Sequence, residues 1–446
     1  MKIAYICADP GISVLGNKGA SVHVREFTEA LVELGHEVHI YSAGASVNGA
    51  DTSDQNTTRV ALTVLAPSES TRNAARLFAS GLARLDGQQN QTHLFSEVQH
   101  VLADPAFVTA ALPLLQDFAP DLIIARHALF STAGLELALR LGCPCVLEVN
   151  APLVEERRRY WGLTLEHEAE QIERTVFAGV DLLVAVSEGV RSYLLRYDAP
   201  RDRIVVLPNG VNLTRFHAAI DGTAVRHRYG LEGKTVIGFS GSLKPWHGVD
   251  LLLRAFASVH AILNYCKPGR NGGEPGNAGL HLLIIGDGPQ REPLMRQSSE
   301  LGVSAAVTFT GPVPHAEVPT HLAALDIAVA PYVSSDGFYF SPLKVMEYLA
   351  MGRATIVPML GQLPSLLQGA AGPCGLLYRP DDQHELAVAL LRLISDGDLR
   401  QQLGARAAAQ ARLRSSWQTI ARQIIERTPC RQPNTPQSRL HEGVSA

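Results

Sequence analysis

Short runs of branched apolar residues alternate with longer amphipathic stretches along most of this chain. This alternation is typical of parallel strands joined by crossover helices. The short runs carry Val, Ile and Leu at consecutive positions, as strands covered by helices on both faces do. The strands expected in the first half are Lys2–Ala8, Glu37–Ala43, Arg59–Ala66, Asp121–Arg126, Pro144–Asn150, Asp181–Ser187 and Ile204–Pro208. Those expected in the second half are Thr235–Gly241, His281–Gly286, Val307–Gly311, Ile327–Pro331, Ala354–Pro358 and Gly375–Tyr378.

The longer stretches predict helices. Ser21–Leu34 ends at Gly35 and Ser131–Leu141 ends at Gly142, and glycine is the common residue just after a helix. The region 45–118 is longer than a simple crossover and looks partly helical. The other expected helices are Val249–Leu263, Pro289–Leu301, Ala316–Leu325, Ser341–Met351, Asp382–Ile394 and Ser416–Arg427.

The fold class predicted is α/β, with two Rossmann-like, doubly wound parallel-sheet domains facing a cleft. A chain of 446 residues is long enough for more than one domain. We expect an N-terminal domain at 1–212, a C-terminal domain at 213–415, a helix at 416–427 that returns to the first domain, and a disordered tail at 428–446. Ligands of such sheets bind at the carboxyl ends of the strands.

Composition restricts the class of protein further. There are 39 Lys and Arg against 43 Asp and Glu, a net charge of −4, which argues against a nucleic-acid binder. We find no apolar run approaching the roughly 18–20 residues that cross a bilayer, and no signal-peptide pattern at the start. The 6 cysteines are scattered and do not suggest a disulfide framework. We therefore expect a cytoplasmic protein.

Several familiar motifs are missing. The loop after the first strand lacks the Gly-x-Gly-x-x-Gly spacing, and we find no P-loop, nucleophile elbow or zinc-binding helix motif. Cys143 and Cys145 are interpreted as buried thiols, and Asp396-Gly-Asp398 as a helix cap rather than a metal motif. Neither a metal nor another cofactor is expected.

Three turns place small or cationic residues where a strand gives way to a helix. They are Gly16-Asn-Lys-Gly19-Ala-Ser-Val-His23, Gly241-Ser242-Leu-Lys244-Pro-Trp-His247 and Ser341-Pro342-Leu343-Lys344-Val-Met-Glu347. Helix N-termini offer free N–H groups and partial positive charge, which suit phosphate. Ser341 is expected as an N-cap and Pro342 as the first helical residue. Lys344 and Glu347 then share one helix face, where a cation can hold phosphate and a carboxylate sugar hydroxyls.

An ordered set of segments resembles the GT-B glycosyltransferases of family 4, which are retaining enzymes that use nucleotide sugars. The segments are GNKGASVHVREFTEALVELGHEVHIYS, SEGVRSYLL, VLPNGVNLTRFH, GFSGSLKPWHGVDLLLRAF, LLIIGDGPQREPL, VTFTGPVPHAEVPTHLAALDIAVAPY and SPLKVMEYLAMGRATIVP. They span almost the whole chain. The resemblance implies a donor site mainly on the second domain, an acceptor site mainly on the first and no required metal.

Two motifs depart from the usual family pattern. Gly241-Ser242-Leu243 replaces Gly-Arg-Leu, and His247-Gly248 replaces Lys-Gly, so the pair that grips the diphosphate is altered. Glu347 matches the second glutamate of the family motif, which holds the nucleoside ribose. Tyr339 occupies the place of the first. The resemblance assigns Lys244 and Lys344 to the diphosphate.

The resulting site prediction has three groups. The resemblance implies a histidine beside the transferred sugar, and His127 is preferred to His23 because it ends a strand whereas His23 sits inside a predicted helix. His127 is expected to orient the sugar rather than to act as a base. The catalytic group is His127, Lys244 and Lys344. The donor-binding group is Gly241, Ser242, His247, Gly286, Val313, Ser341, Pro342, Leu343 and Glu347. The acceptor-side group is Gly16, Gly19, His23 and Asn150.

The reaction implied by the resemblance is transfer of a sugar from a nucleoside diphosphate sugar to an acceptor hydroxyl, with retention, in polysaccharide or glycoconjugate synthesis. Expected partners are the nucleotide sugar and a carbohydrate or lipid-linked acceptor. Contact with the inner face of the membrane stays open, as does the oligomeric state. The alternatives are another GT-B enzyme, such as a sugar-nucleotide epimerase or phosphorylase, and an inactive sugar-nucleotide-binding protein.

Overall fold

The computed structural model describes residues 1–16, 18–44, 58–86, 91–265, 279–334 and 338–429. Most of the predicted tail at 428–446 lies outside these residues. The chain forms two units, Met1–Pro208 with the segment from Ala421 onward, and Asn209–Ile420. The boundaries expected from the sequence were 212/213 and 415/416. The break after Pro208 follows the last strand of the first sheet.

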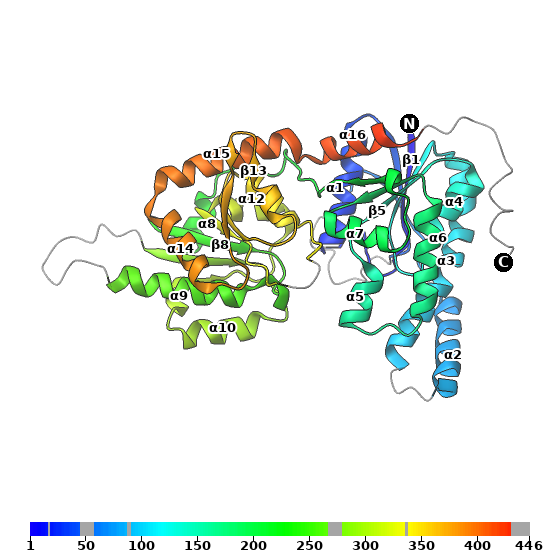
Figure 1. The fold of residues 1–446 in the computed structure, drawn as a ribbon, viewed down its shortest axis with the longest axis horizontal. Helices are drawn as coiled ribbons and strands as arrows, with labels where there is room; N and C mark the ends of the chain where they lie inside the picture. Colours follow the sequence, from blue (N-terminus) through cyan, green and yellow to red (C-terminus); the bar gives the residue numbers. More distant parts are fainter. Residues whose placement is uncertain (17, 45–57, 87–90, 266–278, 335–337, 430–446) are drawn as a thin grey trace, which may run out of the picture. The chain divides into compact units, whose positions relative to one another are not determined.

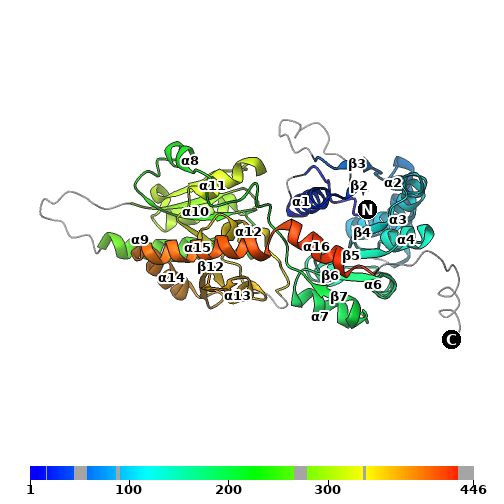
Figure 2. The ribbon, with the colours of Figure 1, turned by 90° about the horizontal axis from the view of Figure 1, so that it is seen from above.

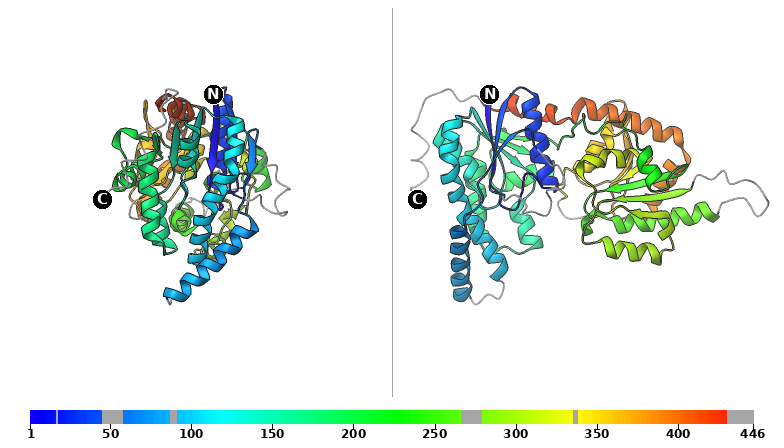
Figure 3. Two further views of the ribbon diagram at one scale, coloured as in Figure 1. Left: turned by 90° about the vertical axis from the view of Figure 1, so that its right-hand side faces the viewer. Right: turned by 180° about the vertical axis from the view of Figure 1, so that it is seen from behind.

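The first unit contains a seven-stranded parallel sheet in the order β3-β2-β1-β4-β5-β6-β7. In Figures 1 and 3, α1 lies on one face of this sheet and α3 and α4 lie on the other. The strands are β1 Lys2–Cys7, β2 Glu37–Ser42, β3 Ala61–Val64, β4 Leu122–Arg126, β5 Cys145–Val149, β6 Leu182–Ala185 and β7 Ile204–Val206. The helices are α1 Gly19–Glu33, α2 Glu69–Asp86, α3 Gln91–Phe118, α4 Ala133–Leu141, α5 Leu153–Tyr160, α6 Glu166–Gly179 and α7 Glu188–Arg196.

The second unit contains a six-stranded parallel sheet in the order β10-β9-β8-β11-β12-β15. The strands are β8 Thr235–Ser240, β9 Leu280–Ile285, β10 Val307–Phe309, β11 Ile327–Val329, β12 Ala354–Pro358 and β15 Gly375–Tyr378, with a small antiparallel pair β13 Gln368–Gly369 and β14 Gly372–Pro373. The helices are α8 Thr223–Arg228, α9 Val249–Tyr265, α10 Arg291–Glu300, α11 Val318–Ala323, α12 Leu343–Ala350, α13 Leu363–Leu366, α14 Gln383–Ser395 and α15 Gly397–Arg414, followed by α16 Trp417–Arg427.

Consecutive residues of the second sheet enter opposite hydrophobic layers. Val236 and Leu283 pack into one apolar cluster with α12, whereas Ile237 and Leu282 pack into another with α9 and α14. In the cluster that contains Val236 and Leu283, α12 also packs against α15 (Figure 2). Side chains alternate between the two faces of a strand, so a strand covered on both faces must be apolar at every position. The two Rossmann-like sheets predicted from the sequence are therefore confirmed.

Helix α3 corrects one expectation. Its segment Leu94–Phe118 is long and apolar enough to cross a membrane by length and composition, a test that core helices of soluble proteins also pass. Two of its acidic residues are bound inside the first unit: Asp104 Oδ2 accepts a hydrogen bond from Thr132 N at 2.8 Å, and Glu97 Oε2 accepts one from Leu165 N at 2.8 Å. The expectation that no run reaches this length was wrong.

Candidate functional site

Two glycine turns meet in the second unit at the carboxyl ends of the neighbouring strands β8 and β9. Strand β8 borders the point where the strand order reverses, between β8 and β11, and doubly wound sheets bind ligands at such a point. Gly241 follows β8 with φ 129°, and Gly286 follows β9 with φ 123°. A Cβ on Gly286 would lie 2.2 Å from the carbonyl oxygen of Gly241. Only glycine allows this backbone conformation and this close approach, so the predicted donor residues Gly241 and Gly286 lie together.

Lys344 of α12 reaches this turn. Its Nζ lies 4.0 Å from the centroid of the Phe239 ring and 5.3 Å from that of Tyr332. The Nζ atom is buried and has no hydrogen-bond partner within the described part of the chain. Burial lowers the pKa of Lys344 to about 7, against the opposing effect of the Glu347 carboxylate. A buried cation without a partner is costly, and a phosphate at this position would supply the missing partner.

Hydrogen bonds hold helix α12 in place, both just before its first residue and within it. Ser341 Oγ accepts a hydrogen bond from Asn209 N at 2.8 Å, and Asn209 Nδ2 donates to the Ser341 carbonyl at 2.7 Å. Tyr348 Oη accepts a hydrogen bond from Ser240 N at 2.7 Å. The helix begins at Leu343 with Pro342 at the N-cap, so the expectation that Ser341 is the N-cap was wrong. Its hydroxyl binds the Asn209 amide instead.

Glu347 lies beside a histidine that the sequence analysis did not select. His315 Nε2 is 3.9 Å from Glu347 Oε1, and each side chain is 14% exposed. On the other side of the ring, Arg215 Nη1 lies 2.8 Å from His315 Nδ1. The signal for His315 in the sequence is its place in one of the segments that resemble family 4, but its partner is 100 residues away.

Of the remaining donor-side residues, His247 contacts the same turn. His247 Nδ1 donates a hydrogen bond to the Ser242 carbonyl, and burial, then the charges of Lys344 and Lys244, lower the pKa of His247 to about 3. His247 is therefore a neutral imidazole. Lys244 Nζ lies 5.8 Å from the Trp246 ring. Val313 is partly buried and packs against the core that contains α12.

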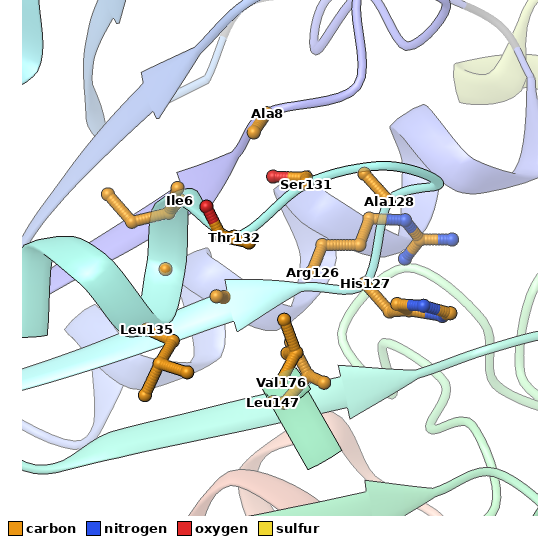
Figure 4. Close-up of a pocket in the computed structure, with 12 residues that line it drawn as sticks. Ile6, Ala8, Arg126, His127, Ala128, Ser131, Thr132, Leu135, Leu147 and Val176 are labelled. Carbon is orange, nitrogen blue, oxygen red and sulfur yellow. The ribbon is translucent and has the colours of Figure 1, made fainter. Parts of the chain in front are cut away.

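In the first unit the strand order reverses between β1 and β4, and His127 directly follows β4. Its Nε2 lies 3.1 Å from Glu173 Oε1, with side chains 4% and 2% exposed, whereas Nδ1 is buried without a hydrogen-bond partner in the described chain. Figure 4 shows Arg126 and His127 at the end of this strand, beside a void of about 10 Å³. That void holds a single water at most, so the histidine is packed rather than open.

His23 is also buried. Its Nε2 lies 3.1 Å from Glu148 Oε1, and the hydroxyl of Tyr5 donates to Glu148 Oε2 at 2.5 Å. The imidazole is thus held inside the domain by a strand carboxylate. Of the other predicted acceptor-side residues, Gly16 lies in the loop before α1, Gly19 begins α1, and Asn150 directly follows β5.

A larger cavity of about 220 Å³ opens in the first unit near the ends of β1, β4 and β5. Arg157 and Trp161 line it, and Arg157 Nε is buried without a partner among the residues described. Asp9 and His100 also line it and lie 3.9 Å apart as an ion pair. The rest of the lining is Glu97, Leu129, Phe130, Leu153 and Glu156. The sequence analysis missed this cavity because its walls come from four separate segments.

Comparisons with known proteins identify the family. The model described as "Glycosyltransferase Family 4" matches residues 17–215, and the model described as "Glycosyl transferases group 1" matches residues 234–396. A D-inositol 3-phosphate glycosyltransferase of Nocardia farcinica is 33% identical over 262 residues, covering 57% of this chain and 53% of that protein. One from Rhodococcus jostii is 29% identical over 430 residues, covering 94% of this chain and 85% of that protein. The chain spans about half the length of the Nocardia relative it matches.

Solved structures agree on the fold. Sucrose-phosphate synthase from Thermosynechococcus elongatus matches with a TM-score of 0.67 at 18% identity, covering 95% of this chain and 97% of that chain. Anabaena Alr3699/HepE in complex with UDP matches with a TM-score of 0.66 at 18% identity, covering 96% and 99%. The two parallel sheets are those of the GT-B fold. The chain belongs to the group 1, family 4 glycosyltransferases.

Proposed function

We propose that the protein transfers a sugar from a nucleoside diphosphate sugar to an acceptor hydroxyl with retention of configuration. One observation carries the proposal: the buried, unpartnered Nζ of Lys344 lies against the Gly241 turn, one helical turn from the Glu347 carboxylate. A cation and a carboxylate at this separation suit a diphosphate and its adjoining ribose. The UDP named with the Anabaena neighbour supports a nucleotide donor.

The residues of the second unit account for the chemistry. The backbone turns at Gly241 and Gly286 let a diphosphate approach the sheet closely, and its charge favours the protonated form of Lys344. As the bond from the sugar to the diphosphate breaks, negative charge builds on the leaving oxygens, and the fixed ammonium stabilises it.

Ligand-induced stabilisation tests the donor. UDP-, GDP- and ADP-sugars are added in turn, and unfolding temperature and product formation are followed. A donor present at 100 times its dissociation constant stabilises the protein by about 2.7 kcal/mol. Lys344→Met and Glu347→Gln should remove most of this stabilisation and the turnover. The control is Lys234→Met, which replaces the lysine directly before β8 and should retain both. Intact binding and turnover in the first two variants would overturn the assignment. Epimerised sugar without a transfer product would instead identify another GT-B activity.

For the acceptor we propose the 220 Å³ cavity of the first unit and an acceptor that carries an anionic group. Arg157 supports this because its Nε lacks a partner, whereas Asp9 is paired with His100 and Glu97 accepts main-chain hydrogen bonds. The relatives named D-inositol 3-phosphate glycosyltransferases support a phosphorylated polyol. D-inositol 3-phosphate and inositol are the probes. Arg157→Gln should raise the KM of the phosphorylated probe and leave donor affinity unchanged. Equal use of both probes by the wild type contradicts the anionic acceptor.

The location we propose is the cytoplasm, with peripheral membrane contact. The four cysteines within the described chain are free and buried, which suits a reducing compartment. Leu77 and Phe78 of α2 are 76% and 61% exposed, and Arg76 lies next to them. Sedimentation with anionic vesicles tests the membrane contact, and Phe78→Ser should reduce the bound fraction. Equal sedimentation of the wild type and Phe78→Ser refutes the proposed membrane contact.

A further inference from the structure

The ring of His315 has a defined direction in the second unit. It lies in the short 3-10 turn His315–Glu317 after β10, and its centroid is 5.7 Å from that of Phe216. Arg215 Nη1 is 2.8 Å from His315 Nδ1. A guanidinium only donates hydrogen bonds, so Nδ1 must be the acceptor and the proton of the neutral ring must be on Nε2. Arg215 therefore fixes both the tautomer and the orientation of the ring.

The Nε2–H of His315 makes no hydrogen bond within the described chain. Glu347 Oε1 is 3.9 Å away, which is beyond hydrogen-bond range, and Nε2 is buried with no hydrogen-bond partner in the described chain. Buried polar groups without partners are rare in folded proteins and often mark a missing ligand or water. The gap between Nε2 and Oε1 has a donor on one side and an acceptor on the other.

A hydroxyl group beside this pair can bridge it, because an oxygen about 2.8 Å from both atoms lies to one side of the 3.9 Å line that joins them. Its oxygen accepts from Nε2–H and its proton goes to the Glu347 carboxylate, with both contacts at about 2.8 Å. A phosphate does not fit, because it would face the carboxylate. Three residues along an α-helix correspond to about 4.5 Å, so a hydroxyl held at Glu347 lies about one ribose away from a phosphate held at Lys344.

We infer that His315, oriented by Arg215, binds one ribose hydroxyl of the donor together with Glu347, and so makes the enzyme selective for ribonucleotides over deoxyribonucleotides. This inference rests on the proposed function, and it adds a binding residue that neither the family motifs quoted above nor the relatives assign. The selectivity arises because a deoxyribose leaves both the imidazole N–H and the carboxylate without a partner.

Nucleotide binding measured by calorimetry tests the inference. The probes are ADP, GDP and UDP, and then the 2′-deoxy and 3′-deoxy forms of whichever binds most tightly. The wild type should bind the ribonucleotide roughly 10- to 100-fold more tightly than one of the deoxy forms. His315→Phe keeps a ring against Phe216 but loses the N–H, so the preference should fall below about threefold through weaker binding of the ribonucleotide. His315→Gln, which restores an N–H, should recover part of the preference.

The matched control is His321→Gln, six residues further along. Its Nδ1 donates to the Glu317 carbonyl at 2.8 Å and its ring lies 6.2 Å from that of Tyr229, so the preference should be unchanged. Equal weakening of ribo and deoxy forms in His315→Phe would make the histidine structural and overturn the inference. Tight wild-type binding without a preference would overturn the inference but leave the proposed function intact. Absence of binding by all three nucleotides would overturn both.

Discussion

Binding of a nucleoside diphosphate should be coupled to the uptake of a proton by Lys344. Replacing Lys344 with methionine should abolish this proton uptake. Burial lowers the pKa of this lysine to about 7, so at pH 8 about nine tenths of the molecules carry a neutral amine. A diphosphate at Nζ favours the charged form. Binding of UDP at pH 8 should therefore take up about 0.9 proton, falling to about 0.1 at pH 6. Above pH 7, affinity should fall nearly tenfold per pH unit, or about 1.4 kcal/mol.

Calorimetry in two buffers of different ionisation enthalpy measures this uptake directly. The difference between wild type and Lys344→Met isolates the lysine from the titration of UDP itself. Lys244→Met is the control and should retain the uptake, because it leaves the Lys344 ammonium in place. Uptake near zero in the wild type at pH 8, or equal uptake in Lys344→Met, would refute the reasoning.

The same lysine should shape the pH dependence of stability without ligand. Its folded pKa is below the unfolded value of 10.5, so the unfolded chain binds more protons between about pH 7 and 10.5. The unfolding free energy contributed by this group therefore rises with pH in that window, by at most about 1.4 kcal/mol per unit. Lys344→Met should lack this rise, and urea titrations at pH 7, 8 and 9 measure it.

Three further substitutions test the packing around the sites. Gly286→Ala would put a Cβ 2.2 Å from the Gly241 carbonyl oxygen and should cost at least about 2 kcal/mol in urea unfolding. Asp396→Ala removes the side-chain cap of α15 and should cost about 1 kcal/mol without changing UDP affinity. Glu148→Gln breaks the buried pair with His23 and should cost about 3 kcal/mol. Since His23 lowers the pKa of Glu148 below its ordinary value of 4.5 despite burial, this contribution should be lost in the wild type as the pH falls below 4.5 and through that lowered pKa.

Two of these substitutions have a control. Gly81→Ala, in the exposed part of α2 where a Cβ meets nothing within 4 Å, should stabilise rather than destabilise. Asp396→Asn retains a good cap and should restore most of the loss. A Gly286→Ala protein as stable as wild type would contradict the close approach of the two turns. Full stability of Glu148→Gln would contradict the buried pair.

The strands were predictable because they are buried on both faces. Every strand of the two large sheets was expected within a few residues, including Ala354–Pro358 and Gly375–Tyr378 with their observed bounds. Asp396 was correctly expected as a helix cap. Helix α15 was not predicted, because its residues 397–414 are rich in Ala and Arg and carry no clear apolar stripe. The β13–β14 pair was missed because each strand has two residues.

The sequence alone therefore determined the two parallel sheets and the helix that carries Lys344 and Glu347, because strand burial and helical spacing are local patterns. Only the tertiary structure decided which polar groups meet. It buried His23 and His127 against Glu148 and Glu173, and it set the ring of His315 between Arg215 and Glu347. Those pairs join residues far apart in the chain, and their distances depend on how helices pack onto the sheets, which no local pattern encodes.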